Sequence, residues 1–445
     1  MTTTIFLPDS EMYTYRYVET EVSGIEFLRL DALDKFVGEY YFFINQGIDT
    51  TIDKLFYMEY ISTMNGNVQP SDAVDIKKHI KKVFPERIIK DVQSGKCKYI
   101  MDQSLEGHWD INWEFIFDAL SITEEKNYYL IFLKKLWRKM KRVEDANAKE
   151  QLVWLSGDFK IHEKTNNIAM YINWWEKNCC EQIPHVSDIT QTQLKLIESY
   201  TERAKYNTLY SRRVRHHRTT FMVALVYHNL LDNMIWSWGG DVPYGPSGVT
   251  ARVTLQDKLL NKKGETLSAL SGRDSVKEKK YSESYDVVSQ WGNVVTEMAD
   301  TGTDLTINHC NIATPSHVLN TYYQCIVETY ATAGETTFLS EKSFKPFMLM
   351  QPFVMYGDPL TVQALRDHGY NVYDKWIDHG YDLIMDPIER MESLIREISR
   401  LNSISHSEWS IMLYEMKDIL IANHKHLSTA TSRHNINLQR VTWEH

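Results

Sequence analysis

The residues best suited to chemistry lie in the segment TFLSEKSFKPFMLMQPFVMYGDP, residues 337–359. An acidic–basic pair, Glu341 and Lys342, follows Ser340 where a strand gives way to a helix, and Lys345 comes three residues later. The first N–H groups of a helix are unpaired and its dipole is positive there, so a helix start attracts anions. Two lysines strengthen that field, and the carboxylate suits a ligand that carries sugar hydroxyls. We therefore predict a site for a nucleotide or nucleotide-sugar; the alternative is a surface salt-bridge cluster.

Two further groups would share this edge of the fold. Ligands of open α/β sheets bind beyond the carboxyl ends of the strands, where Glu328 would lie at the end of a predicted strand, residues 322–330. A basic run, residues 212–218, precedes a strongly apolar segment and contains the candidates Arg215 and Arg218. Arg218 falls at the predicted helix start, where a guanidinium can hold a diphosphate through two parallel hydrogen bonds. The alternative for this run is a solvated basic turn.

A possible general base lies in the first half of the chain. The segment KYIMDQSLEG, residues 98–107, predicts a strand followed by a loop, with Asp102 and Glu106 near its end. A carboxylate at a strand end that faces a cleft can deprotonate an acceptor hydroxyl. The alternative is that these carboxylates only cap turns.

Two basic runs in the same half interleave cations with aromatic residues. They are KKHIKKVFPERIIK, residues 77–90, and KKLWRKMKR, residues 134–142. Such runs are typical of proteins that bind the phosphate backbone of double-stranded DNA, and the alternative is a pair of solvated helix faces. The formal net charge of the chain, −10, argues against a surface that is basic throughout.

The composition indicates a globular protein rather than a membrane or disulfide-rich one. The chain has 445 residues, and its five cysteines show no C-x-x-C spacing, which suits reduced thiols in the cytoplasm. The apolar run 221–238 contains polar residues and predicts a buried helix instead of a membrane span. We expect a cytoplasmic protein without a signal peptide or membrane contact. No Asp-x-Asp pair is present, so we expect no metal site, and arginine and lysine would neutralise a departing diphosphate.

Strands and helices alternate along the chain. Predicted strands near the N-terminus, at 98–107 and at 150–161, with helices at 71–90 and 113–120, indicate a parallel sheet. A polar stretch at 181–205 marks a domain boundary, and residues 239–284 read as a long insertion. The last third predicts a strand at PFVMYG, a helix from Asp358-Pro359 to Gly369, a strand at 371–378, and helices at 386–401 and 407–425. This order describes a doubly wound α/β domain.

The segment SEKSFKPFMLMQPFVMYGDP, with RHHRTTFMVAL about a hundred residues earlier, resembles fucosyltransferase-like glycosyltransferases of GT-B architecture. It is more similar still to a group of bacteriophage-encoded glycosyltransferases. The resemblance implies two Rossmann-like domains that face a central cleft. The acceptor-binding domain would span residues 1–200, and the donor-binding domain residues 201–405. A C-terminal segment, residues 406–445, would pack back on the first domain.

The resemblance also implies roles for the candidate residues. Lys342 and Arg218 would bind the diphosphate of a UDP- or GDP-linked sugar, Glu341 would hold the ribose, and Lys345 and Glu328 would be neighbours. No separate cofactor is implied, because the nucleotide-sugar is a co-substrate. The acceptor would be a hydroxymethylated pyrimidine in phage DNA, which the basic runs favour. The alternatives are a glycan or protein acceptor, and a non-catalytic nucleic-acid-binding or structural module.

Overall fold

The protein is seen here in a computed structural model that describes part of the chain in detail. The described residues are 3–7, 24–45, 86–94, 96–103, 152–156, 169–171, 173–211, 216–238, 275–289, 294–295, 315–331 and 337–433. The chain forms two compact units, Met1–Trp174 with Thr431–His445, and Trp175–Ala430. The division at Trp174 lies before residue 200, the boundary expected from the sequence, so the helices that follow Trp174 belong largely to the second unit.

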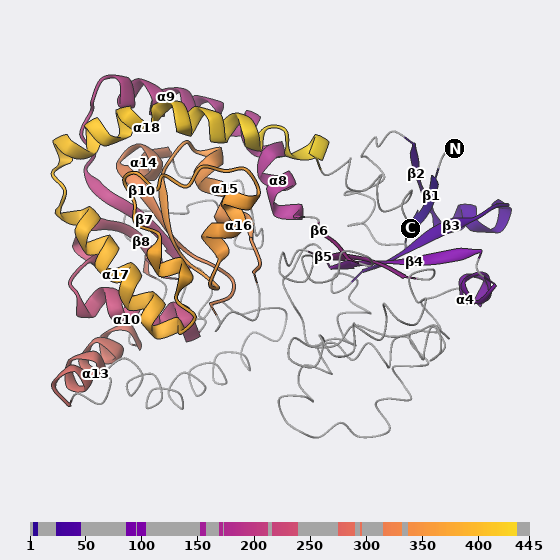
Figure 1. Ribbon diagram of the computed structural model, residues 1–445, viewed down its shortest axis with the longest axis horizontal. Helices are drawn as coiled ribbons and strands as arrows, with labels where there is room; N and C mark the ends of the chain where they lie inside the picture. The colour runs from indigo at the N-terminus through magenta and orange to yellow at the C-terminus, as the bar shows by residue number, and fades with distance from the viewer. Residues whose placement is uncertain are drawn as a thin grey trace. The chain divides into compact units, whose positions relative to one another are not determined.

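The first unit contains a six-stranded sheet in which every pairing of neighbouring strands is parallel (Figure 1). The strand order is β2-β1-β3-β4-β5-β6. The elements of this unit are β1 (Thr3–Leu7), β2 (Ile25–Arg29), η2 (Leu30–Lys35), β3 (Tyr40–Asn45), α4 (Glu86–Gln93), β4 (Cys97–Gln103), β5 (Leu152–Ser156) and β6 (Ala169–Tyr171). Phe6, Phe36 and Tyr40 meet edge to face between these elements. The parallel sheet expected for the first half of the chain is therefore present.

The second unit contains a five-stranded sheet with the order β11-β10-β7-β8-β9. Its strands are β7 (Lys205–Ser211), β8 (Met234–Trp238), β9 (Val294–Val295), β10 (Thr321–Val327) and β11 (Phe353–Tyr356). Strands β11, β10, β7 and β8 are parallel, and β9 pairs antiparallel with β8. Every residue of the interior strand β10 is buried, as expected for a parallel strand covered on both faces.

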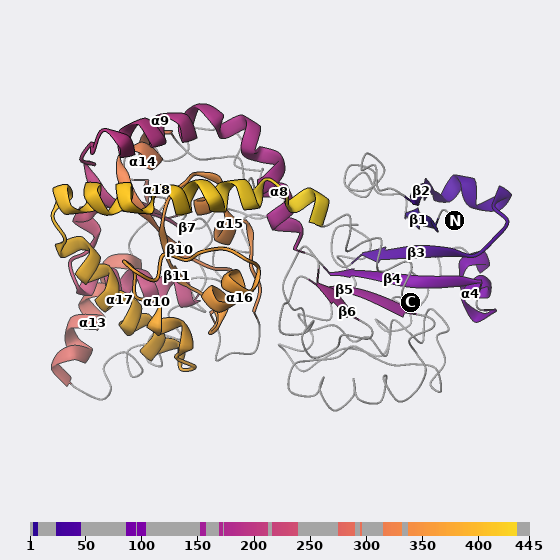
Figure 2. The same ribbon diagram turned by 45° about the horizontal axis from the view of Figure 1, so that its top comes forward.

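Helices cover this second sheet in two groups (Figures 1 and 2). The helices are α8 (Trp174–Gln182), η5 (Ile183–Val186), α9 (Ser187–Glu198), α10 (His216–Tyr227), η6 (Leu231–Asn233), α13 (Ser275–Ser289), α14 (Pro315–Leu319), α15 (Glu341–Met348), α16 (Thr361–Asp367), η7 (Gly380–Leu383), α17 (Pro387–Ser403) and α18 (His406–Leu427). Helix α18 packs against α9 and α15, whereas α10 packs against α13 and α17. The crossovers β7-α10-β8 and β10-α15-β11 give the unit its doubly wound character.

The apolar run at residues 221–238 does not form the single buried helix that its composition predicts. Helix α10 ends at Tyr227, and the chain turns through Asn229, whose φ is +54°, before β8 begins at Met234. Asparagine is one of the few residues that enter the left-handed region at modest cost. The polar residues that exclude a membrane span therefore mark a turn between a helix and a strand.

The strand expected at residues 371–378 is absent; these residues form turns. Tyr373 has a φ of +70°, which is incompatible with a continuing strand. The free edge of β11 is satisfied by a side chain instead, because the N–H of Met355 donates to the Tyr381 hydroxyl at 3.0 Å. Strand β11 is consequently the edge strand of the sheet. The segment NVYDKWID has the apolar pattern of a strand because most of its apolar residues are buried, but they do not pair with β11.

The helix after β11 also begins later than its sequence signal suggests. Asp358-Pro359 does not open it; α16 starts at Thr361, after Leu360 with a φ of +67°. The carboxylate of Asp382 accepts hydrogen bonds from the N–H groups of Val362 and Gln363 at 3.0 and 2.9 Å. A cap that comes from twenty residues away replaces the local one.

The last two helices follow their capping signals. Asp386 accepts hydrogen bonds from the second and third N–H groups of α17, both at 2.9 Å. Ser405 and Glu408 form a reciprocal capping box at the start of α18. Among the described residues, no helix is both long enough and apolar enough to cross a lipid bilayer.

Candidate functional site

The carboxyl ends of β7 and β10 bring together the predicted residues of the second unit. These strands are parallel neighbours, so β7 leads toward α10 on the same edge where β10 ends and Glu328 follows it. The chain then returns through Ser340, which caps the N-terminus of α15. Three segments that are far apart in the sequence therefore meet where the parallel strands have their carboxyl ends. We call this side of the second unit the sheet edge and take it as the candidate site.

Glu328 is the centre of the arrangement and is only 1% exposed. Its carboxylate accepts hydrogen bonds from Ser340 through both the backbone N–H, at 3.1 Å, and the hydroxyl, at 2.7 and 2.9 Å. The Ser343 hydroxyl donates at 2.6 Å, and so does the N–H of Thr329. A buried carboxylate is tolerated when its lone pairs are satisfied in this way. Glu328 therefore fastens the start of α15 to the end of β10.

The position of Glu328 also explains why a glycine, Gly357, follows β11. A Cβ atom on Gly357 would lie 3.3 Å from the Cβ of Glu328 and 3.2 Å from the Thr361 hydroxyl oxygen. Both distances are shorter than an ordinary contact between such atoms. Glycine at this position lets the backbone that follows β11 approach Glu328 closely.

The ammonium group of Lys342 lies within the same network, and the Lys342 side chain is 24% exposed. It donates to the Ser340 hydroxyl at 2.9 Å, to the Glu341 carboxylate at 2.9 Å and to the Thr329 hydroxyl at 3.4 Å. The Ser340 hydroxyl in turn donates a hydrogen bond to the Glu328 carboxylate. A lysine has three donors, and all three are used here within the protein.

Glu341 lies beside Lys342 with its side chain 10% exposed. Burial acts to raise the pKa of Glu341, but the positive charges of Lys342 and Lys345 and the hydrogen bond from Lys342 outweigh it and bring the pKa down to about 2. The carboxylate is therefore ionised throughout the physiological pH range, and its charge is balanced by that of the two lysines.

Arg218 and His217 approach the other side of Glu328. The guanidinium of Arg218 donates to the Glu328 carbonyl oxygen at 3.4 Å, and the Nε2 atom of His217 lies 3.0 Å from the same oxygen. Arg218 is 4% exposed. The backbone carbonyl of Glu328 thus contacts Arg218, and the side chain of Glu328 connects through Ser340 to Lys342. Glu328 therefore links the two residues that we expect to bind the diphosphate.

The remaining predicted residues fall in several places. Lys345 is half-buried on α15, near Glu341. Asp102 is the second-last residue of β4 and pairs with Asn45 and Leu155 in the neighbouring strands of the first unit. Arg215 and Glu106 lie outside the described residues.

The basic runs are also largely outside the described part of the chain. Of residues 77–90, only 86–90 are described; they begin α4, where Lys90 pairs with Glu86 at 2.8 Å. Residues 134–142 are not among those described.

Three residues of the network were not selected from the sequence: His217, Thr329 and Ser343. His217 was part of the basic run, but nothing in its spacing showed that it would contact Glu328. Thr329 and Ser343 each follow a selected residue, Glu328 and Lys342, and each donates a 2.6 Å hydrogen bond to the Glu328 carboxylate. A polar residue directly after a strand-end glutamate is a signal that could have identified Thr329.

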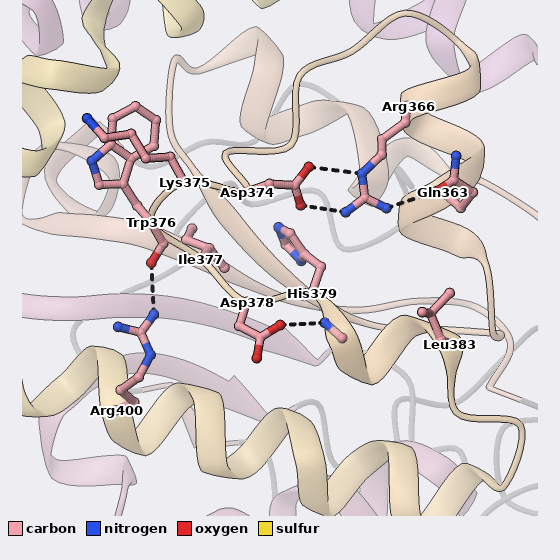
Figure 3. A pocket seen from close by; sticks show the side chains of 11 residues that line it. Gln363, Arg366, Asp374, Lys375, Trp376, Ile377, Asp378, His379, Leu383 and Arg400 are labelled. Carbon is pink, nitrogen blue, oxygen red and sulfur yellow. Dashed lines mark hydrogen bonds and ion pairs between the residues drawn. The ribbon is translucent and has the colours of Figure 1, made fainter.

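A separate hollow of about 430 Å³ lies beside α16 and α17 (Figure 3). Its polar side chains are matched to one another: Arg366 forms two bonds with Asp374, at 2.6 and 3.1 Å, and a third with Gln363 at 3.1 Å. Arg400 donates to the Trp376 carbonyl oxygen at 2.8 Å. None of the residues predicted from the sequence lines it. For this reason we place the candidate site at the sheet edge and not here.

Comparisons with known proteins give little further guidance. No protein-family model matches the sequence, and no curated protein matches it. A solved structure, the α,α-trehalose-phosphate synthase (UDP-forming) from Burkholderia xenovorans in complex with glucose-6-phosphate, aligns with 98% of this chain and all of its own. The two chains are 8% identical and the TM-score is 0.37, so no argument about fold or function is drawn from this likeness.

The chemistry available at the edge is that of an anion site with an acidic rim. The edge gathers three cationic side chains, Lys342, Lys345 and Arg218, and two carboxylates, Glu328 and Glu341, which leaves a net positive charge. Within the described residues, no cluster of three or more histidine, cysteine, aspartate or glutamate side chains could hold a metal ion.

Proposed function

We propose that this protein is a glycosyltransferase of GT-B type that moves a sugar from a nucleoside-diphosphate donor to a hydroxyl group. One observation carries the proposal. Arg218, at the start of α10, and Lys342, at the start of α15, meet around Glu328 at the carboxyl edge of a parallel sheet. That edge is where α/β sheets bind nucleotides, and helix starts favour phosphate.

The proposal gives the residues distinct roles. Lys342, the more exposed cation, contacts the diphosphate, and the buried Arg218 supports it from beneath. Glu341 accepts hydrogen bonds from the ribose hydroxyls. Glu328 touches no ligand and holds the start of α15 in place, because its oxygens are satisfied within the protein.

In the reaction, the acceptor oxygen attacks the anomeric carbon and the bond from that carbon to the diphosphate oxygen breaks. The acceptor proton passes to a carboxylate of the first unit, Asp102 or Glu106. The leaving diphosphate gains negative charge, which Lys342 and Arg218 stabilise without a metal ion. Fixed cations directed at charge that develops in the transition state typically supply a large share of the rate.

Calorimetric titration of the full chain with UDP, GDP and their common sugar conjugates tests the proposal. We expect one of these nucleotides to bind with a dissociation constant in the micromolar to millimolar range, as is usual for enzyme substrates. In the same titration Lys342→Ala should weaken the binding, whereas Lys375→Ala, which removes a lysine that also pairs with a glutamate at 2.9 Å, should leave it unchanged. Absence of binding by every nucleotide would remove the proposal.

For the acceptor we propose a hydroxymethylated pyrimidine in DNA, on the basis of the two basic runs at 77–90 and 134–142. An enzyme that acts within a duplex would have to flip the base out of the stack. Binding to duplex DNA should then weaken steeply as salt rises from 50 to 200 mM, by roughly a thousandfold if about six phosphates are contacted. Weak binding without salt dependence would favour a glycan or protein acceptor instead.

A further inference from the structure

The pairing of Glu341 with Lys342 has a consequence for any anion that enters the site. The Lys342 ammonium uses its three donors on Thr329, Ser340 and Glu341, and the bond to Glu341 is 2.9 Å long. Of these three acceptors, only Glu341 carries a full charge toward the lysine. An incoming phosphate must therefore compete with a carboxylate that already neutralises the lysine.

Displacing Glu341 from Lys342 is costly unless the ligand supplies new hydrogen-bond donors to the Glu341 carboxylate. Its side chain is 10% exposed, and while the two lysines face it its pKa is about 2, so the anion meets an ionised carboxylate that is already bound to the lysine. A mostly buried carboxylate that loses its partner carries a large desolvation penalty, and it also repels an anion bound to the neighbouring lysine. A simple anion thus meets both costs.

A nucleoside diphosphate avoids these costs. Its phosphates take the place of Glu341 on Lys342, while its ribose hydroxyls donate hydrogen bonds to the displaced carboxylate. Glu341 and Lys342 give up their bond to each other, and each gains a partner on the same ligand. Neither buried charge is left without a partner. Specificity of this kind depends on a penalty against the wrong ligand as much as on contacts with the right one.

We infer that Glu341 is a specificity-determining residue that excludes inorganic phosphate and pyrophosphate from the site and admits anions that also carry vicinal hydroxyls. The inference rests on the proposed function, since it concerns the same site. It adds that the glutamate acts before the ribose arrives, by occupying the lysine.

The test compares wild type with Glu341→Gln, which keeps the shape of the side chain and removes its charge. Calorimetry in metal-free buffer measures the affinity for inorganic pyrophosphate and for the nucleoside diphosphate that binds best. We expect the variant to bind pyrophosphate at least about tenfold more tightly, because the competing charge is gone. It should bind the nucleoside diphosphate no better than wild type does. Glu415→Gln, which breaks the 2.9 Å pair with Lys375, is the control and should change neither affinity.

The outcomes separate the inference from the function beneath it. If wild type binds a nucleoside diphosphate and Glu341→Gln binds pyrophosphate no more tightly, the inference is wrong and the proposed function stands. If wild type binds no nucleoside diphosphate, the proposed function fails and the inference fails with it. Thermal unfolding establishes that the variant is folded, and Glu341→Ala provides a second variant should the glutamine misfold.

Discussion

At the scale of single residues, the site depends on a division of labour between two glutamates. Glu328 is buried and every hydrogen bond to its carboxylate comes from a neutral donor of the protein. Glu341 is nearer the surface and faces lysines. The first therefore acts on structure and the second on ligands, although both are glutamates within fifteen residues of each other.

Replacing Glu328 with glutamine should destabilise the second unit. The amide nitrogen of glutamine would face donors from Ser340, Ser343 or Thr329, so at least one buried donor would lose its acceptor, at a cost of about 1–3 kcal/mol. Chemical denaturation measures the change in the free energy of unfolding. Glu389→Gln, at an exposed position in the first turn of α17, should stay within about 0.5 kcal/mol of wild type. Equal stability of the two variants would contradict the role assigned to Glu328.

Replacing Lys342 with alanine should slow glycosyl transfer by roughly a hundredfold or more, since a cation that stabilises the leaving diphosphate would be lost. Steady-state kinetics with the donor identified by calorimetry gives the ratio of kcat values. Lys375→Ala should leave the rate unchanged. Near-normal turnover by the Lys342 variant would exclude this mechanism.

At the scale of elements, the region after β11 shows how one edge strand is completed without a further strand. The N–H of Met355 donates to the Tyr381 hydroxyl, which lies 2.7 Å from Nδ1 of His379. Nε2 of His379 lies 2.7 Å from the Val372 carbonyl oxygen and donates to it. In the neutral imidazole the proton lies on Nε2, because a carbonyl oxygen can only accept, and Nδ1 accepts the Tyr381 hydroxyl proton; a proton on Nδ1 would remove that acceptor.

Protonation of His379 should therefore weaken the fold. Burial lowers the pKa of His379 to about 4, below its ordinary value of 6.5. The stabilisation is complete above pH 6.5 and is lost as the pH falls toward 4, which amounts to roughly 3 kcal/mol. We expect the difference in unfolding free energy between wild type and His379→Gln to shrink over this range.

That difference is the quantity to measure, because Asp382 titrates in the opposite sense nearby. Burial raises the pKa of Asp382 to about 6, so its contribution to stability falls as the pH rises from about 3.8 toward 6. Both proteins contain Asp382, and its effect cancels in the comparison. A difference that stays constant from pH 7 to pH 4 would show that His379 is not held neutral.

At the scale of the whole molecule, the chain comprises two compact units, one with a parallel sheet and one with a mostly parallel sheet. All the described residues of the candidate donor site belong to the unit Trp175–Ala430, whereas Asp102 belongs to the other. In the proposed function, donor binding and acceptor activation therefore belong to different units, which a truncation can test.

A fragment of residues 175–430 should fold cooperatively and bind the nucleoside diphosphate with an affinity within about tenfold of the full chain. A unit of this size with its own buried sheet is within the range of independently folding domains. Thermal unfolding and calorimetry measure the two properties, and the fragment should show no transfer activity. Transfer by the fragment alone would show that the general base lies outside the first unit.

The sequence by itself determined the elements whose signals are local. The capped helices α17 and α18, the strands β10 and β11 and the parallel pairing of most strands follow from capping residues, glycines and apolar runs. It also selected the three segments that contain Arg218, Glu328 and Lys342. Only the tertiary structure decided that these segments meet around one buried glutamate, that Tyr381 and not a strand completes the edge of β11, and that Asp382 caps α16. Each of those contacts joins residues that are separated along the chain, and local patterns carry no information about which distant partner will satisfy a buried polar group.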